Sequence, residues 1–372
     1  MTHFEKLSVA VIGAGVAGLG AAWRLAQSGC AVTLFDSAPI PAQSGAATWA
    51  SGGMLCARLE MTGAPPPLAA FALGARAAWP AFAAELERVA AISCGFTERG
   101  ALHVAFGRER AGTAGPGVER IDRAAALRLE PGLADEVTEA LWAAGEAHVD
   151  PRWLALALVR ACRSAGVTLA AETRVNRIVE QQGRVSGVLT ASGVQGFDHV
   201  VLAAGAWSAG LLKVSNLPGP GVRPVKGEMV SFAADPRAMP ASRLIWSDDC
   251  YIIPHADGRV LIGATQIESG FDASLDQGRI DALRDAAIRV LPALGSLAEL
   301  ERFAGFRPAS DDGLPLLGGV GPDGLTLAGG QFRNGILFAP LVADAAAQHV
   351  LQGRLPEIAR PFAAGRFTEI AA

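Results

Sequence analysis

Three glycines near the start of the sequence are spaced so that they could hold a pyrophosphate. Gly13, Gly15 and Gly18 form a G-x-G-x-x-G motif. In this motif the first glycine permits a tight turn, the second lets the backbone approach a pyrophosphate, and the third lets a helix pack close to a strand. Asp36 follows at the distance where a carboxylate accepts hydrogen bonds from a ribose hydroxyl. These residues predict a dinucleotide site; the alternative is a glycine-rich turn in an unrelated α/β protein.

A strand, a helix and a second strand are expected around these glycines. Residues 7–12 form a short apolar run rich in valine and isoleucine, which is typical of a buried parallel strand. A helical pattern covers residues 16–27, and residues 31–35 form the next strand. In such a βαβ unit the helix N-terminus presents unpaired N–H groups and a partial positive charge to the phosphates.

Three polar side chains in the C-terminal half are candidates for a ligand-binding site. Tyr251, the only tyrosine, lies in an apolar strand-like run, so its hydroxyl needs either a ligand or a hydrogen bond in the core. Arg307 stands in a turning segment, where its planar guanidinium either holds a carboxylate through two hydrogen bonds or lies on the surface. Arg333 lies between an expected strand and an expected helix, where loops deliver side chains to the carboxyl end of a sheet.

The chain does not continue as a plain nicotinamide dehydrogenase would. Residues 37–53 are rich in Ala, Ser, Pro and Gly, where another βα unit would be expected. A turn from residue 193 leads to a strand expected over 200–205. Another strand is expected over 325–330, with a helix over 341–351. A nucleotide-binding domain assembled from three separated pieces is typical of FAD-binding folds of the glutathione-reductase or amine-oxidase type.

Composition excludes several classes of protein. The 372 residues are 51% hydrophobic and carry a formal net charge of −4, without the basic footprint of a nucleic-acid partner. The five cysteines lack metal-type spacing, which indicates free thiols in a reducing compartment and no metal site. Residues 68–86, the best candidate for a membrane span, contain charges and a proline and predict an amphipathic or buried helix. Because no secretory leader is recognised, we expect a cytoplasmic protein with no transmembrane segment.

Other polar residues are expected to have structural roles. Asp150 precedes a proline and a helical pattern, so it is interpreted as a helix N-cap. Lys226 is expected to pair with Glu228 on one strand face, although a position near the active centre is the alternative. Asp248 and Asp249 lack a third hard ligand and are expected in a solvated loop.

Eight segments, taken in order, resemble the D-amino-acid oxidase superfamily, and within it the glycine oxidases, which are associated with thiazole formation in thiamine biosynthesis. The resemblance covers nearly the whole chain. It is carried by residues 11–18, 53–55, 148–151, 224–228, 250–254, 263–265, 305–308 and 332–337.

The resemblance implies an α/β plus α+β architecture with two domains. A discontinuous, Rossmann-like FAD-binding domain would comprise residues 1–57, 145–220 and 300–372. A substrate-binding domain built on an antiparallel sheet would comprise residues 58–144 and 221–299. By this resemblance the cofactor-binding residues are Gly13, Gly15, Val16, Ala17, Gly18, Asp36, Ser37, Thr48, Gly52, Gly53, Met54, Val175, Gly205, Gln331, Phe332, Arg333, Asn334, Gly335, Ile336 and Leu337.

The same resemblance implies that Arg307 and Tyr251 hold a substrate carboxylate, with Arg333 also at the substrate. The implied reaction is oxidative deamination of glycine, another small amine or a D-amino acid. A hydride would leave Cα for flavin N5, giving a 2-oxo acid and ammonia, with H₂O₂ formed if O₂ is the acceptor. This chemistry does not require a general base. The alternatives are a D-amino-acid or sarcosine-type dehydrogenase with another acceptor, and an FAD-bound non-catalytic or partner-dependent module.

Departures from the family pattern concern the flavin linkage and the substrate. No cysteine follows Cys250, so FAD should be bound non-covalently. Asp249 and Gln266 stand where some relatives carry His and Met, and Gln331 stands where His is common. Asp36 replaces the usual glutamate, which shortens its reach by one methylene. Relatives are often tetramers, so a homo-oligomer is expected.

Overall fold

The computed structural model describes residues 6–42, 45–107 and 109–367. Its helices are α1 (Val16–Gln27), α2 (Ala57–Glu60), α3 (Pro66–Ala90), α4 (Arg123–Leu129), α5 (Pro151–Ser164), α6 (Ser208–Val214), α7 (Gln277–Val290) and α8 (Gly335–Gln352). Short 3₁₀ helices cover Gly205–Trp207, Pro292–Ser296, Glu357–Phe362 and Ala364–Phe367. No helix in these ranges is long and apolar enough to cross a membrane.

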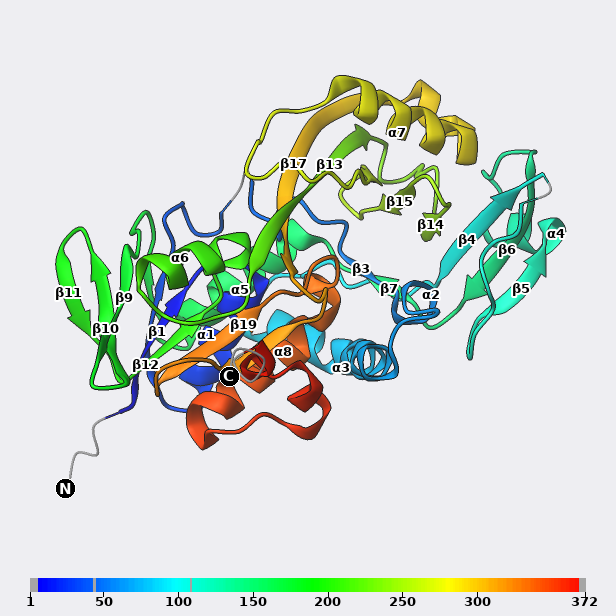
Figure 1. The fold of residues 1–372 in the computed structure, drawn as a ribbon. Coiled ribbons are helices and arrows are strands. Elements are labelled where there is room, and N and C mark those ends of the chain that lie inside the picture. The colour runs from blue at the N-terminus through cyan, green and yellow to red at the C-terminus, as the bar shows by residue number, and fades with distance from the viewer. Residues whose placement is uncertain (1–5, 43–44, 108, 368–372) are drawn as a thin grey trace.

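A six-stranded sheet forms one half of the molecule (Figure 1). Its order is β18-β19-β12-β1-β2-β8, and all pairs are parallel except β18 with β19. The strands are β1 (Ser8–Ile12), β2 (Ala31–Phe35), β8 (Thr168–Ala170), β12 (His199–Leu202), β18 (Leu316–Gly319) and β19 (Leu325–Gly329). The sheet therefore draws its strands from three distant stretches of the chain, as expected.

An eight-stranded sheet forms the other half, with the order β17-β13-β16-β15-β14-β4-β6-β5. Its strands are β4 (Ala101–Phe106), β5 (Glu119–Asp122), β6 (Val137–Ala143), β13 (Val222–Ala233), β14 (Leu244–Trp246), β15 (Tyr251–Pro254), β16 (Arg259–Gly263) and β17 (Ala298–Ser310). Its consecutive strands β13, β16, β15 and β14 are antiparallel to their neighbours, as expected for this sheet. The whole sheet is mixed, however, because β14 pairs in parallel with β4. The division of the chain into two domains stays a prediction.

Two small sheets complete the fold. One contains β9 (Arg177–Gln181), β10 (Arg184–Thr190) and β11 (Gly193–Gly196), and the other pairs β3 (Met54–Leu55) with β7 (Ala147–His148). The turn expected from residue 193 is thus the strand β11, which is held by its register with β10. The expected C-terminal helix begins six residues earlier than predicted, since α8 accommodates Pro340 in its second turn.

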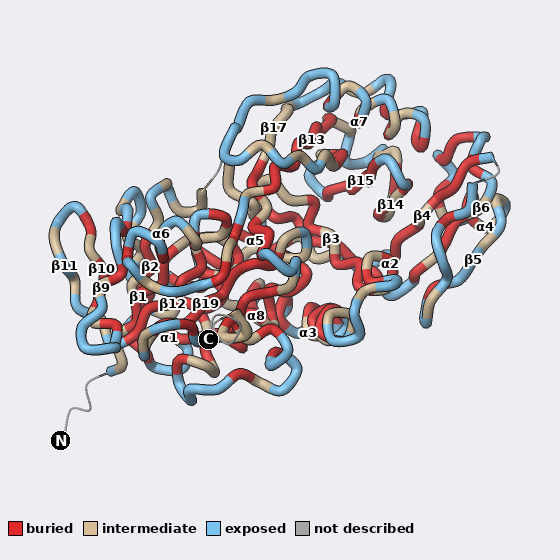
Figure 2. Tube along the Cα trace, in the orientation of Figure 1, coloured by how far each residue is buried: buried red, intermediate tan, exposed pale blue. Residues whose placement is uncertain are grey.

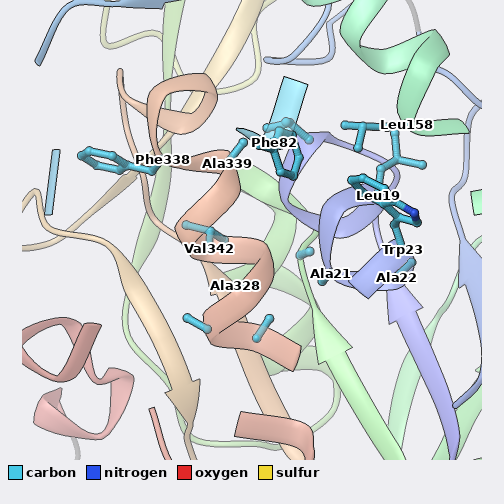
Figure 3. Packing of buried hydrophobic residues seen from close by; sticks show 14 of the residues in the cluster. Leu19, Ala21, Ala22, Trp23, Phe82, Leu158, Ala328, Phe338, Ala339 and Val342 are labelled. Atoms are coloured by element: carbon cyan, nitrogen blue, oxygen red, sulfur yellow. The ribbon is translucent and has the colours of Figure 1, made fainter. Parts of the chain in front are cut away.

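The main core lies between α1, α3, α5, α8 and one face of the six-stranded sheet. Figure 3 shows Leu19 and Trp23 of α1 packed near Phe82 of α3 and Leu158 of α5. Small residues let α1 and α8 approach closely, because a Cβ atom at Gly20 would lie 3.0 Å from Cβ of Ala343. The central strands are buried while the outer helix faces meet solvent (Figure 2). This packing fixes the first turn of α1 and of α8 at the carboxyl edge of the sheet.

Candidate active site

One cavity of about 990 Å³ connects the two large sheets. At one end it is lined by the turn between β1 and α1, and at the other by side chains of β15 and β17. Most of the expected site residues line it: Gly13, Gly15, Val16, Ala17, Asp36, Ser37, Thr48, Gly52, Gly53, Met54, Val175, Gly205, Tyr251, Arg307, Gln331, Phe332, Arg333, Gly335 and Ile336. Three expected site residues do not line it, although each is adjacent in sequence to a residue that does: Gly18, Asn334 and Leu337.

The glycine-rich turn has the close contacts that its motif predicts. Gly13 has φ +105°, and a Cβ atom there would lie 2.5 Å from the carbonyl oxygen of Ala203. A Cβ atom at Gly18 would lie 1.8 Å from the Gly13 carbonyl oxygen, so only glycine lets α1 start this close to β1. Gly18 thus shapes the turn from behind the cavity wall.

Two polar side chains fix the backbone of this turn. The Asp36 carboxylate accepts hydrogen bonds from the N–H groups of Ala14 (2.7 Å) and Ala38 (2.9 Å) while lining the cavity. The Thr48 hydroxyl accepts one from the N–H of Val16, at 2.9 Å, in the first turn of α1. Asp36 therefore has a structural role in addition to the ribose contact that remains predicted for it.

The start of α8 presents polar groups that have no protein partner. Nε2 of Gln331, which lines the cavity, is buried and makes no hydrogen bond to any described residue. Oδ1 of Asn334 is also buried and unpaired, but Asn334 does not line the cavity. Unpaired buried polar atoms are costly, so a ligand that offers an acceptor to Gln331 would stabilise this wall. The carbonyl oxygens of an isoalloxazine ring are such acceptors, and the residues present therefore fit FAD.

Tyr251 and Arg307 meet at the other end of the cavity. The Arg307 guanidinium donates to the carbonyl oxygen of Thr265 at 3.0 Å, and burial lowers the pKa of this arginine. The Tyr251 hydroxyl contacts the sulfur of Met229 at 3.9 Å, and burial raises the pKa of the phenol while Arg307 lowers it. Sulfur is a weak acceptor, so this contact leaves the hydroxyl able to bind a ligand.

Two glycines make room for these side chains. A Cβ atom at Gly227 of β13 would lie 2.3 Å from both terminal nitrogens of Arg307. A Cβ atom at Gly263 of β16 would lie 2.3 Å from the Tyr251 hydroxyl oxygen. Neither clearance can be read from the sequence, because each depends on the register between neighbouring strands.

Sequence reasoning also missed a carboxyl group at this end. Glu60, the last residue of α2, lines the cavity together with Arg307 and Arg333. Burial raises the pKa of Glu60 to about 7, against the lowering effect of both arginines. Glu60 belongs to no motif, and the sequence indicates it only by its position shortly after residues 52–55.

The residues expected to be structural behave accordingly. The Asp150 carboxylate caps α5, accepting from the N–H groups of Arg152 (2.9 Å) and Trp153 (3.2 Å). Lys226 Nζ lies 3.2 Å from Glu228 Oε1 in a buried ion pair. Asp248 is exposed and contacts His103, as expected of a solvated loop, but Asp248 and Asp249 also line the cavity.

The family follows from a match over most of the chain. Residues 8–349 match the sequence profile of the DAO family, described as FAD-dependent oxidoreductases. The chain belongs to the DAO family. Its cofactor is therefore FAD, in agreement with the fit of the cavity wall.

Relatives in the DAO family share the fold throughout. The chain is 35% identical to the glycine oxidase of Geobacillus kaustophilus over 92% of its own length and 91% of that protein. The crystal structure of glycine oxidase from Geobacillus kaustophilus superposes with a TM-score of 0.87, at 31% identity, covering 96% of this chain and 98% of the other. The chain is 33% identical to the bifunctional protein ThiO/ThiG of a Synechocystis species, over 96% of its own length, but it spans only 54% of that protein.

Proposed function

We propose that this DAO-family protein oxidises glycine or another small amine or D-amino acid to the corresponding 2-oxo acid and ammonia. The observation that carries the proposal is the pairing of Arg307 with Tyr251 at one end of a cavity whose other end is the dinucleotide turn. The similarity to glycine oxidases over more than nine-tenths of the chain supports the substrate class.

In this proposal the protein orients a carboxylate and shields it from water. The planar guanidinium of Arg307 binds both carboxylate oxygens, and the Tyr251 hydroxyl donates a further hydrogen bond. The bond from Arg307 to the Thr265 carbonyl fixes the direction of the guanidinium before substrate arrives. Bound FAD supplies hydride acceptance from Cα and, on reoxidation by O₂, yields H₂O₂.

Non-covalent binding of FAD is part of the proposal. Cys250 is the cysteine that lines the cavity, but it is buried, and burial raises its pKa to about 11. The group is therefore a thiol at neutral pH, which is a poor nucleophile. Among the described residues the Cys250 sulfur makes one polar contact, to the Ser247 hydroxyl at 3.6 Å.

A dehydrogenase with an apolar acceptor is the second candidate, and one observation favours it. Trp207 and Phe271 line the cavity with their rings stacked at 5.1 Å, yet their exposed fractions are 45% and 49%. Half-exposed stacked aromatic rings could receive a quinone-like acceptor at the edge of the cavity. The first proposal also includes O₂ as the acceptor, a homo-oligomeric state and a cytoplasmic location. The five cysteines are free and buried, which supports the cytoplasmic location.

The test is anaerobic mixing of the purified yellow protein with glycine, sarcosine, D-alanine, D-proline and L-alanine in turn, following the loss of flavin absorbance. The proposal expects bleaching by glycine or other small amines and none by L-alanine. Admission of air then separates the two candidates, because an oxidase recovers its colour at once and forms peroxide. A protein that no member of the panel bleaches would refute the substrate assignment and favour the non-catalytic alternative.

A further inference from the structure

A carboxyl group at the substrate end of the cavity has no hydrogen-bond or ion-pair partner among the described residues. Glu60 ends α2, and its backbone N–H bonds to the Cys56 carbonyl oxygen. Among the described residues its carboxylate makes no hydrogen bond and no ion pair, although it lines the cavity. A largely buried carboxyl group without a partner needs a ligand, because burial of an unpaired charge is costly.

The charges around Glu60 define what that ligand must offer. Arg333 and Arg307 face it from the start of α8 and from β17, and both favour its ionised form. Glu146, in the turn between β6 and β7, opposes ionisation. Glu60 in turn raises the pKa of the Tyr251 phenol and of the Cys56 thiol. Two cationic groups and one carboxyl group that line the same cavity are complementary to a zwitterion, with its carboxylate on the arginines and its ammonium on Glu60.

We propose that Glu60 binds the ammonium group of the substrate and takes a proton from it. The proposal rests on the proposed amine oxidation. The ammonium form of an amine has no lone pair and cannot release a hydride from Cα. Transfer of one proton from R–CH₂–NH₃⁺ to the carboxylate gives R–CH₂–NH₂ and the neutral carboxylic acid. The nitrogen lone pair then forms the C=N bond as the Cα–H bond breaks with its electron pair, leaving R–CH=NH₂⁺.

The position of Glu60 suits this role. A proton acceptor works best when its pKa lies near the working pH, and burial beside Glu146 brings Glu60 to about 7. The arginines keep part of the population ionised, so the free enzyme can bind an ammonium group. Hydride transfer itself still needs no base, and the role of Glu60 is limited to the protonation state of the bound amine.

The first experiment compares Glu60→Gln with Glu60→Asp and with the matched control Glu119→Gln, an exposed glutamate of β5. The rate of anaerobic flavin bleaching by glycine is measured between about pH 6 and 10, together with FAD content. Glu60→Gln should slow bleaching near neutrality on the order of 100-fold, and the deficit should shrink at high pH, where solution supplies the free amine. Glu60→Asp should restore part of the rate, and the control should match the wild type.

An equal loss at every pH would indicate a structural role and overturn the proposal, as would an unchanged profile. A second measurement needs no turnover: acetate binding, followed as a change in flavin absorbance. Protonation of Glu60 removes a negative charge beside both arginines, so the wild type should bind acetate roughly tenfold tighter at pH 6 than at pH 8. In Glu60→Gln the affinity for acetate should be the same at both pH values. Acetate affinity independent of pH in the wild type would overturn the placement of Glu60. A wild-type protein that no amine bleaches would instead overturn the proposed function, and the proton transfer with it.

Discussion

Replacement of Gly227 by alanine is the sharpest test of the carboxylate site. The new Cβ atom would lie 2.3 Å from both terminal nitrogens of Arg307 and 2.4 Å from its Cζ. Ordinary van der Waals contact begins at 3.4 Å, so the guanidinium must retreat by about 1 Å. Gly227 does not have a positive φ, so the backbone accepts alanine without strain.

The displaced group is the far end of a flexible side chain, and therefore folding should be little affected while substrate binding suffers. A misplacement of about 1 Å in a positioning group costs on the order of 100-fold in rate. Such a loss corresponds to about 2.7 kcal/mol of transition-state stabilisation. We expect kcat/KM for the best amine of the panel to fall by this factor, with FAD content and thermal midpoint close to those of the wild type.

The assay is peroxide formation or anaerobic bleaching, with Gly196→Ala as the control. Gly196 also lies in a strand, but the nearest atom to its added Cβ would be 3.8 Å away, in the backbone of Ser186. If Gly227→Ala retains activity within about threefold of the wild type while the control behaves normally, the position of Arg307 does not determine substrate binding. The reasoning from cavity geometry would then be refuted.

Three further predictions concern stability and cofactor attachment. Burial lowers the pKa of His148 to about 3, so between pH 7 and pH 5 the unfolded chain binds a proton at this residue that the folded protein does not, and this residue alone lowers the free energy of unfolding by about 2 kcal/mol. His199 and His255, whose pKa values burial lowers to about 4, add to the same trend. In urea titrations the loss of unfolding free energy from pH 7 to pH 5 should be smaller in His148→Gln than in the wild type, and an equal loss in both would contradict this. Lys226→Met leaves the fully buried Glu228 without its cation and should cost about 3–5 kcal/mol of unfolding free energy, part of which the double variant with Glu228→Gln should recover. Acid precipitation should release all FAD into the supernatant, whereas a yellow pellet would show a covalent linkage.

Local patterns were sufficient to predict the parts of the fold that depend on neighbours in sequence. The helix over 16–27 and the strand over 31–35 are confirmed with the same bounds, since their apolar periodicity and the flanking glycines are local signals. The Asp150 cap is confirmed for the same reason. The ion pair of Lys226 with Glu228 is also confirmed, because alternate residues of one strand share a face.

Features that depend on distant partners could not be predicted in this way. β11 contains two glycines and a glutamine, and it becomes a strand only because β10 offers the register. Glu60 joins the site only through the fold, because Arg307 and Arg333, which line the cavity with it, come from β17 and from the segment before α8. α8 begins at Gly335, ahead of the predicted start at residue 341, and it contains Pro340 in its second turn. Its first turn packs against α3, where the Trp79 indole N–H donates to the Leu337 carbonyl oxygen, a contact that depends on a distant part of the chain.

The order of strands in the six-stranded sheet has a consequence for protein synthesis. β1 pairs with β12 and β2, and α1 is covered by α8, yet α8 ends at Gln352. At about 5–20 residues per second, a ribosome needs roughly 15–60 s to travel from β1 to β19. Until β12 and the residues after it have been made, the dinucleotide turn lacks the Ala203 backbone against which it packs. Until α8 has been made, the apolar face of α1 that α8 covers is exposed. We therefore expect FAD to bind stably only after α8 has left the ribosome, and until then the apolar face of α1 is open to contacts with other chains.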